Sequence, residues 1–91
     1  MQHDTSLVIH ERPGVYPPSE DTYLLLRCVD VSPGERILEV GAGTGIISCH
    51  AAAAGANVTA VDLNPLAIEC TRLNAMENAL SMNVIESDLL E

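Results

Sequence analysis

The feature that most constrains the fold is the stretch RILEVGAGTG, which runs from Arg36 to Gly45. An apolar segment ends here in a loop with glycine at every second position, and glycine tolerates the positive φ angles of tight turns. The next residues, TGIISCHAAAAG, are rich in alanine, the best helix former, and close with Gly55, a natural left-handed helix end. The stretch therefore predicts a buried strand from Arg36 to Val40, a glycine loop, and a helix from about Thr44.

The following segments repeat this alternation of strand and helix. ANVTAVD, residues 56–62, is rich in β-branched side chains and predicts a second strand. A second helix is expected with Asn64 as N-cap, Pro65 at its first position and an end near Asn78. MNVIESD, residues 82–88, predicts a third strand. This order predicts an α/β fold, a Rossmann-like doubly wound parallel sheet that is incomplete, with about three strands.

The N-terminal part has a different pattern. Residues 1–18 are expected to form a leader or lid with a short strand at Leu7–Ile9, followed by RPGVYPP, whose prolines exclude regular structure. Ser19 is expected to cap a helix that is largely buried. We expect residues 19–91 to be the N-terminal half of a larger domain, because three parallel strands leave open edges. Such edges also predict self-association of the chain.

Composition excludes several classes of function. Lys and Arg total 4 and Asp and Glu total 13, which gives a net charge of -9. This charge would repel a phosphate backbone, so we do not expect this segment to bind nucleic acid directly. The chain has neither a membrane-spanning apolar run nor a signal peptide, so we expect no membrane association. Cys28, Cys49 and Cys70 lack metal-ligand spacing and predict buried free thiols in a reducing compartment, which favours a cytoplasmic location.

Acidic residues mark the ends of the three predicted strands: Glu39, Asp62 and Asp88. Because parallel strands place their carboxyl ends at one edge of the sheet, where open α/β sheets bind ligands, we expect these acids to converge on one site. Simpler interpretations remain open. Asp62 is also placed to begin an Asx turn before Pro65, and Asp88 to be a solvated loop residue.

The chemistry of this edge favours a cationic ligand over a dinucleotide. A pyrophosphate near Glu39 would cost about 1–4 kcal/mol of electrostatic repulsion, and the third position of the dinucleotide fingerprint is Ile46 instead of glycine. S-adenosylmethionine carries a sulfonium and an ammonium and no phosphate. In that case Asp62 is placed for the ribose hydroxyls and Asp88 for the adenine amino group.

The motifs ILEVGAGTGIIS, VTAVDLNPLAIECTRLNA and VIESDLL resemble the first three motifs of class I S-adenosylmethionine-dependent methyltransferases, which have a seven-stranded sheet. VYPPSEDTYLLL is similar to the segment before the first strand in the release-factor glutamine methyltransferases (HemK-like), especially the archaeal and eukaryotic type. Those enzymes methylate the glutamine of a Gly-Gly-Gln loop. Together these motifs cover nearly the whole chain.

The resemblance implies a cofactor site, and several positions match it. The implied cofactor-binding residues are Thr22, Glu39, Gly41, Gly43, Asp62, Asp88 and Leu89, with Asn64 a weaker candidate. For PSEDT, a capped helix start whose acids complement the helix dipole remains the alternative interpretation. No catalytic residue and no metal ligand of this chain is implied.

The resemblance also implies a reaction and partners. An amide nitrogen of a peptide release factor would attack the sulfonium methyl in line, and a small zinc-binding protein would act as activator. The Asn-Pro-Pro-aromatic motif that holds the acceptor amide in the family is not among these 91 residues, so we expect the chain to be inactive alone. Two alternatives stay open: an amino-group methyltransferase acting on RNA or DNA, and a nucleotide-binding module without methyl transfer.

Other polar and aromatic residues carry weaker expectations. Tyr16 and Tyr23 either line the mouth of the pocket or belong to the core. His3 and His10 are expected in a mobile leader, and His50 in a helix as a solvated or core residue, so the sequence offers no general base.

Overall fold

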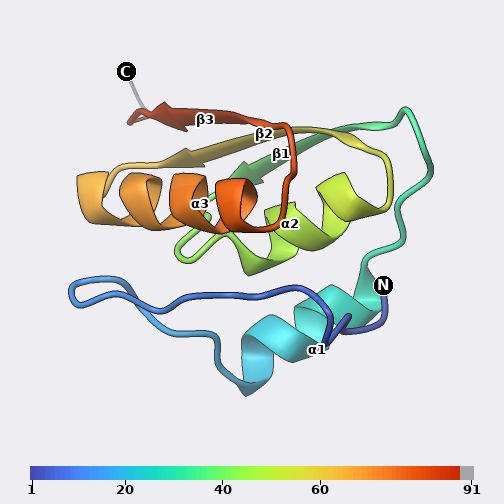
Figure 1. The fold of residues 1–91 in the computed structure, drawn as a ribbon, viewed down its shortest axis with the longest axis horizontal. Helices are drawn as coiled ribbons and strands as arrows, with labels where there is room; N and C mark the ends of the chain where they lie inside the picture. The colour runs from blue at the N-terminus through green and yellow to red at the C-terminus, as the bar shows by residue number, and fades with distance from the viewer. Residues whose placement is uncertain (89–91) are drawn as a thin grey trace.

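The structure, a computed structural model that describes residues 1–88, is an α/β fold around a three-stranded parallel sheet in the order β1-β2-β3 (Figure 1). The elements are α1 (Glu20–Cys28), β1 (Arg36–Val40), α2 (Ile46–Ala53), β2 (Asn57–Asp62), α3 (Pro65–Glu77) and β3 (Asn83–Glu86). The incomplete Rossmann-like fold and the alternation of strands and helices predicted from the sequence are confirmed.

Three layers stack on one another (Figure 1). The sheet is the first, and α2 and α3 cover one of its faces as the second, because both crossovers run in the same direction along the sheet. The third layer consists of α1, which packs on α2 through Leu26, and of the N-terminal leader, which runs along α3. In register, Glu39 pairs with Ala60 and Asp62 with Glu86, so the carboxyl ends of all three strands lie along one edge.

The sheet face opposite the helices is open among the described residues. Leu38 and Val40 of β1 are 60% and 63% exposed, and Ile85 of β3 is 47% exposed. The expectation of a buried first strand is therefore wrong for one of its faces. Burial in β1 alternates, because helices cover only the face that carries Ile37 and Glu39.

The helix α1 begins where the sequence predicts, with Ser19 as its N-cap, but it is not largely buried. Only Leu26 is buried, against Ile46 and Ile47 of α2, whereas Leu24 and Leu25 are each 52% exposed. Tyr23 is partly buried and packs on the same cluster, so only one side of α1 is covered.

The expectation of buried cysteines holds for two of the three. Cys49 and Cys70 are buried, and Cys28, at the exposed end of α1, is not. Burial raises the pKa of the Cys49 thiol to about 11. All three thiols are free.

The strand predicted at Leu7–Ile9 is wrong: this part of the leader has no strand. The backbone of Val8 instead pairs with the side-chain amide of Asn78, the C-cap of α3, and the backbone of His10, just beyond, pairs with Asn74 of α3. The leader is thus fastened along a helix and not along a sheet edge. Within residues 1–88, no helix is both long and apolar enough to cross a membrane.

Candidate functional site

The glycine loop, residues 41–45, turns the chain sharply from β1 into α2. Gly41, Gly43 and Gly45 have φ angles of 76°, 59° and 82°, a region that side chains rarely allow. At Gly45 a second constraint applies, because a Cβ atom there would lie 2.7 Å from Cγ2 of Thr71. The loop therefore needs glycine at its last position for both backbone shape and packing against α3.

The backbone amides of this loop are already used by protein acceptors. Gly41 and Ala42 donate to the carbonyl of Val61 at 2.7 and 3.2 Å, and Gly45 donates to the carbonyl of Ala42 at 2.8 Å. Gly43 donates to Oδ2 of Asp62 at 3.0 Å. A phosphate-binding loop directs such amides at its ligand. These four N–H groups point into the protein, so they do not form an anion cradle.

Glu39 occupies the N-terminus of α2, the other place where a phosphate would bind. Its Oε1 accepts hydrogen bonds from the backbone N–H of Ser48 at 3.1 Å and from the Ser48 hydroxyl at 2.5 Å. Free amides and the helix dipole at such an N-terminus stabilise an anion. Here a carboxylate of the chain itself supplies the anion.

The surroundings of Glu39 are unfavourable for its own charge. Burial raises the pKa of the Glu39 carboxyl above its ordinary value, against the opposing effect of the two Ser48 hydrogen bonds. The nearby Asp62 carboxylate raises this pKa further. A cation bound beside Glu39 would relieve this cost, whereas a phosphate would add to it.

Asp62 ends β2 and organises the loops on both sides of it. Its Oδ2 accepts from Gly43, and its Oδ1 accepts from the backbone N–H of Asn64 at 2.9 Å. The Asx turn that was the simpler interpretation of Asp62 is therefore present. Asn64 caps α3 as predicted, with its Oδ1 accepting from the N–H of Leu66 at 3.0 Å. Each oxygen of the half-buried Asp62 retains a lone pair that a ligand hydroxyl can use.

A cavity of about 470 Å³ opens at this edge of the sheet, between the glycine loop and the end of the leader. Its volume lies within the range of small-molecule sites. Four of the predicted cofactor residues line it together: Thr22, Glu39, Gly41 and Gly43. Asp62 adjoins them through its bond to Gly43.

The remaining predicted positions lie elsewhere. Asp88 is exposed beyond the end of β3 and is not among the residues that line this cavity. Leu89 lies outside the described residues. A larger hollow of about 710 Å³ opens at the opposite edge, beside Arg36, Asn57 and Asn83 at the starts of the strands. Open α/β sheets bind their ligands at the carboxyl edge, so the smaller cavity is the candidate site.

For Thr22 and the two tyrosines, the sequence left open whether they line the pocket or serve the helix start or the core. Oγ1 of Thr22 accepts from the N–H of Ser19 at 3.0 Å, so Thr22 helps to form the start of α1 while it lines the cavity. Tyr16 lines the same cavity and is 93% exposed, and Tyr23 packs on the cluster around Leu26.

The histidines lie away from the cavity. His50 is buried, with Nδ1 2.7 Å from the carbonyl of Ile46 and Nε2 accepting from the N–H of Asp4 at 2.9 Å. The ring of His3 packs at a tilt against the rings of Tyr23 and His50. Among residues 1–88, no three or more His, Cys, Asp or Glu side chains are grouped so as to hold a metal ion.

Three functional side chains were missed by the sequence reasoning: Ser48, Thr71 and Asn74. All three are fully buried. Ser48 holds Glu39, Thr71 donates to the carbonyl of Gly43 at 3.0 Å, and Asn74 donates to the carbonyl of Thr44 at 2.8 Å. The available signal was a polar residue on a helix face that otherwise carries alanine, cysteine and isoleucine.

Comparison with known proteins points to one family. The family model described as "Methyltransferase small domain" matches residues 6–91. A Methanocaldococcus jannaschii protein with a provisional assignment as a protein N5-glutamine methyltransferase is 44% identical over 81 residues, which is 87% of this chain and 41% of that protein.

Two solved structures have the same fold. The precorrin 8W decarboxylase of Methanobacterium thermoautotrophicum has a TM-score of 0.76 and 27% identity, covering 88% of this chain and 45% of that one. The Pyrococcus abyssi tRNA (uracil-54, C5)-methyltransferase in complex with S-adenosyl-L-homocysteine has a TM-score of 0.71 and 29% identity, covering 84% of this chain and 20% of that one. The chain thus spans less than half the length of each of these proteins.

Proposed function

The chain belongs to the methyltransferase small domain family, as the resemblance of its motifs predicted, and on that premise we propose that the cavity beside Glu39 binds S-adenosylmethionine. The protein would then be an S-adenosylmethionine-dependent methyltransferase. The cavity is large enough for a small-molecule cofactor and opens at the carboxyl edge of the sheet.

One observation carries the proposal: the carboxylate of Glu39 occupies the N-terminus of α2. Dinucleotide-binding folds place a pyrophosphate at this position. In this chain the position is negatively charged, and four of the adjacent loop amides are engaged. The site therefore favours a nucleoside that carries positive charge and no phosphate.

Different residues of the site contact different parts of the ligand. Glu39 attracts the positive charge of the ligand, and Asp62 offers its remaining lone pairs to the ribose hydroxyls. Thr22 and the end of the leader form the opposite wall of the cavity. S-adenosylmethionine, when bound, supplies an electrophilic methyl group. The contribution of this chain is orientation of the cofactor and exclusion of water.

For the acceptor, we propose a glutamine amide of a protein, in the first place a peptide release factor. The relative from M. jannaschii supports this proposal, and so does the segment VYPPSEDT, which here forms the wall of the cavity and the start of α1. A small zinc-binding activator protein remains part of the proposal, with any metal held by that partner. The cytoplasm remains the proposed location.

An RNA acceptor is the second candidate, favoured by the likeness to the P. abyssi tRNA methyltransferase. The net charge of -9 opposes direct contact of this chain with RNA. Methyl transfer distinguishes the two acceptors: a Gly-Gly-Gln peptide and a tRNA are each incubated with radiolabelled S-adenosylmethionine and with this chain joined to a segment that carries the Asn-Pro-Pro-aromatic motif of the family. Labelling of the peptide glutamine supports the first proposal, and labelling of the tRNA alone contradicts it.

Calorimetric titration tests the cofactor proposal. S-adenosylhomocysteine should bind the chain, NAD should not, and Asp62→Ala should lose at least about tenfold in affinity through lost hydrogen bonds. Asp30→Ala, an exposed aspartate in the connection after α1, is the matched control and should bind like the wild type. Binding of NAD in preference to S-adenosylhomocysteine would indicate the alternative of a nucleotide-binding module.

A further inference from the structure

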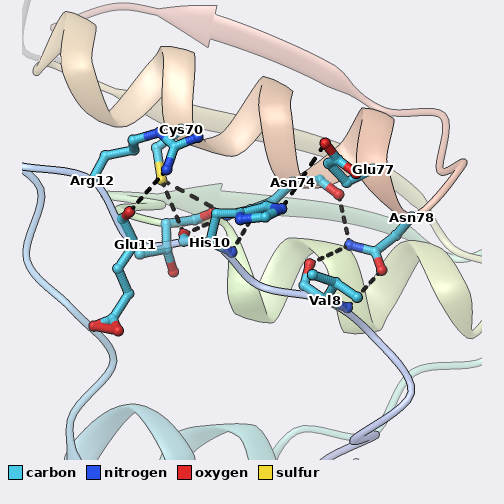
Figure 2. Close-up of polar contacts among 9 residues, drawn as sticks. Val8, His10, Glu11, Arg12, Cys70, Asn74, Glu77 and Asn78 are labelled. Carbon is cyan, nitrogen blue, oxygen red and sulfur yellow. Dashed lines mark hydrogen bonds and ion pairs between the residues drawn. The ribbon is translucent and has the colours of Figure 1, made fainter.

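The side-chain amides of Asn74 in α3 and of its C-cap Asn78 hold the leader in place (Figure 2). Residues 8–14, named the strap here, run along α3 in the opposite direction. Asn78 binds Val8, Asn74 binds His10, and Asn64 binds the carbonyl of Gly14 at 2.9 Å. Three asparagines along one helix thus fix three points of a segment that contains no helix or strand.

Two of these contacts are reciprocal (Figure 2). Oδ1 of Asn78 accepts from the N–H of Val8 at 2.8 Å, and its Nδ2 donates to the carbonyl of Val8 at 2.7 Å. Asn74 repeats the pattern with His10, at 2.7 and 3.0 Å. Each amide replaces a neighbouring strand for one residue of the strap. Because only backbone atoms are bound, these contacts determine the path of the strap and not its side chains.

The side chain of Asn74 also binds the glycine loop. Its Nδ2 donates both to the carbonyl of His10 in the strap and to the carbonyl of Thr44 in the glycine loop, at 3.0 and 2.8 Å. The side chain is fully buried, so water cannot replace either bond without opening the structure. One turn away, Thr71 holds the loop alone through Gly43. Asn74 therefore joins two segments that are remote in sequence.

The strap also leads directly into the wall of the cavity. Val15, which follows it, is buried against Ala67 and Cys70 of α3, and the chain then forms the wall from Tyr16 to Thr22. A Cβ atom at Gly43 would lie 3.9 Å from the carbonyl oxygen of Tyr16, so wall and loop face each other closely. The position of the strap therefore affects both the wall and the glycine loop, which line the cavity.

We propose that Asn74 is a positioning residue that couples the seating of the strap on α3 to the geometry of the glycine loop, so that ligand binding and strap docking stabilise each other. The ligand part of this inference rests on the proposed function. A ligand that fits the cavity only when Thr44 and the wall are in place must favour the docked strap. Linkage then requires a docked strap to favour the ligand by the same factor.

The first test uses the chain without ligand and the variant Asn78→Ala, which touches the strap but not the glycine loop. Amide hydrogen exchange should become at least about tenfold faster at Val8, because its acceptor is lost. The coupling predicts that exchange at His10 also rises and that the amide resonances of Gly43, Thr44 and Gly45 shift. Asn57→Ala, at the amino end of β2, is the matched control and should change none of these signals.

Thr71→Val probes the link from the other side, because Thr71 touches the loop but not the strap. Faster exchange at Val8 and His10 in this variant supports the coupling. Loop resonances unchanged in Asn78→Ala, together with strap exchange unchanged in Thr71→Val, would overturn it. Both variants leave the fully buried Asn74 in place, so the test needs no substitution at Asn74 that could prevent folding.

The second test measures the affinity for S-adenosylhomocysteine. Asn78→Ala should lower it roughly fivefold or more relative to Asn57→Ala, and saturating ligand should slow exchange at Val8 in the wild type. Equal affinities of the two variants, with no protection of Val8 by the ligand, would overturn the ligand part of the inference. If the wild type does not bind the ligand, the proposed function fails, and the ligand-free test still decides the coupling of strap and loop.

Discussion

The ends of β1 and β2 lie side by side on one edge of the sheet, and each carries a carboxylate, but the two carboxylates differ in what surrounds them. Glu39 accepts its hydrogen bonds from one residue of α2, and burial raises its pKa. Asp62 is half exposed and accepts from the backbones of two separate loops, at Gly43 and Asn64. Asp62 is therefore a structural brace that also keeps lone pairs free for a ligand, whereas the charge of Glu39 is, in our proposal, kept for the ligand alone.

The two carboxylates differ in which hydrogen-bond donors they satisfy. Asp62 satisfies two backbone amides that would otherwise need water, and so it stabilises the glycine loop and the start of α3. Glu39 satisfies only groups of Ser48, and its charge is held where burial disfavours it. Such a cost is typical of functional sites. The following substitutions, and a change of pH, distinguish the structural role of Asp62 from the charge of Glu39.

Asp62→Ala should have the largest effect on the free energy of unfolding. Removing the acceptors of the Gly43 and Asn64 amides should lower it by about 1–3 kcal/mol. Urea unfolding, with Asp30→Ala as the control, measures the change. A loss no greater than that of the control would show that Asp62 is not a brace.

Ser48→Ala should have an intermediate effect. It removes the hydroxyl bond to Glu39 and leaves the backbone bond, so about 1 kcal/mol of stability should be lost. The pKa of the Glu39 carboxyl should rise further, because a bond to its charged form is gone. NMR titration of the Glu39 carboxyl carbon measures this pKa, and an unchanged value would refute the assigned contact.

Glu39→Gln should raise the stability at neutral pH, by less than Asp62→Ala lowers it. A glutamine oxygen can accept both Ser48 bonds without a charge that burial disfavours. The thermal midpoint should therefore increase, while Glu69→Gln, at an exposed position of α3, should leave it unchanged. A decrease for Glu39→Gln would mean that Glu39 is also a brace.

The pH dependence should give the smallest effect. A carboxyl whose folded pKa is raised binds more protons in the folded than in the unfolded state between the two pKa values, so its contribution falls as pH rises through that window. The advantage of Glu39→Gln over the wild type should thus shrink as pH falls toward the ordinary value of 4.5. Unfolding of both proteins across this range measures it, and an advantage independent of pH would exclude the charge as its cause.

The sequence predicted the part of the molecule whose signals are local. The strand at Arg36–Val40, the glycine turn, the left-handed end at Gly55 and the cap at Asn64 follow from propensity and turn chemistry at those positions. That Glu39 and Asp62 lie at the same edge of the sheet followed from the parallel topology alone.

What the sequence could not supply depends on partners that are remote along the chain. The residues Leu7–Ile9 have strand-like composition, yet the C-cap asparagine of α3, Asn78, binds the backbone N–H and carbonyl of Val8. The exposure of Leu24, Leu25 and Cys28 reflects how little of the fold faces α1. Inside a helix, a polar residue such as Asn74 gives the same signal whether it faces water or a buried loop.

The central claim is that the negative charge of Glu39 selects a positively charged ligand. S-adenosylmethionine and S-adenosylhomocysteine differ by one methyl group and one positive charge, so their affinity ratio isolates this effect. Calorimetry on the wild type and Glu39→Gln should show that the variant loses more affinity for S-adenosylmethionine than for S-adenosylhomocysteine. Equal losses for the two ligands, or none, would contradict the account.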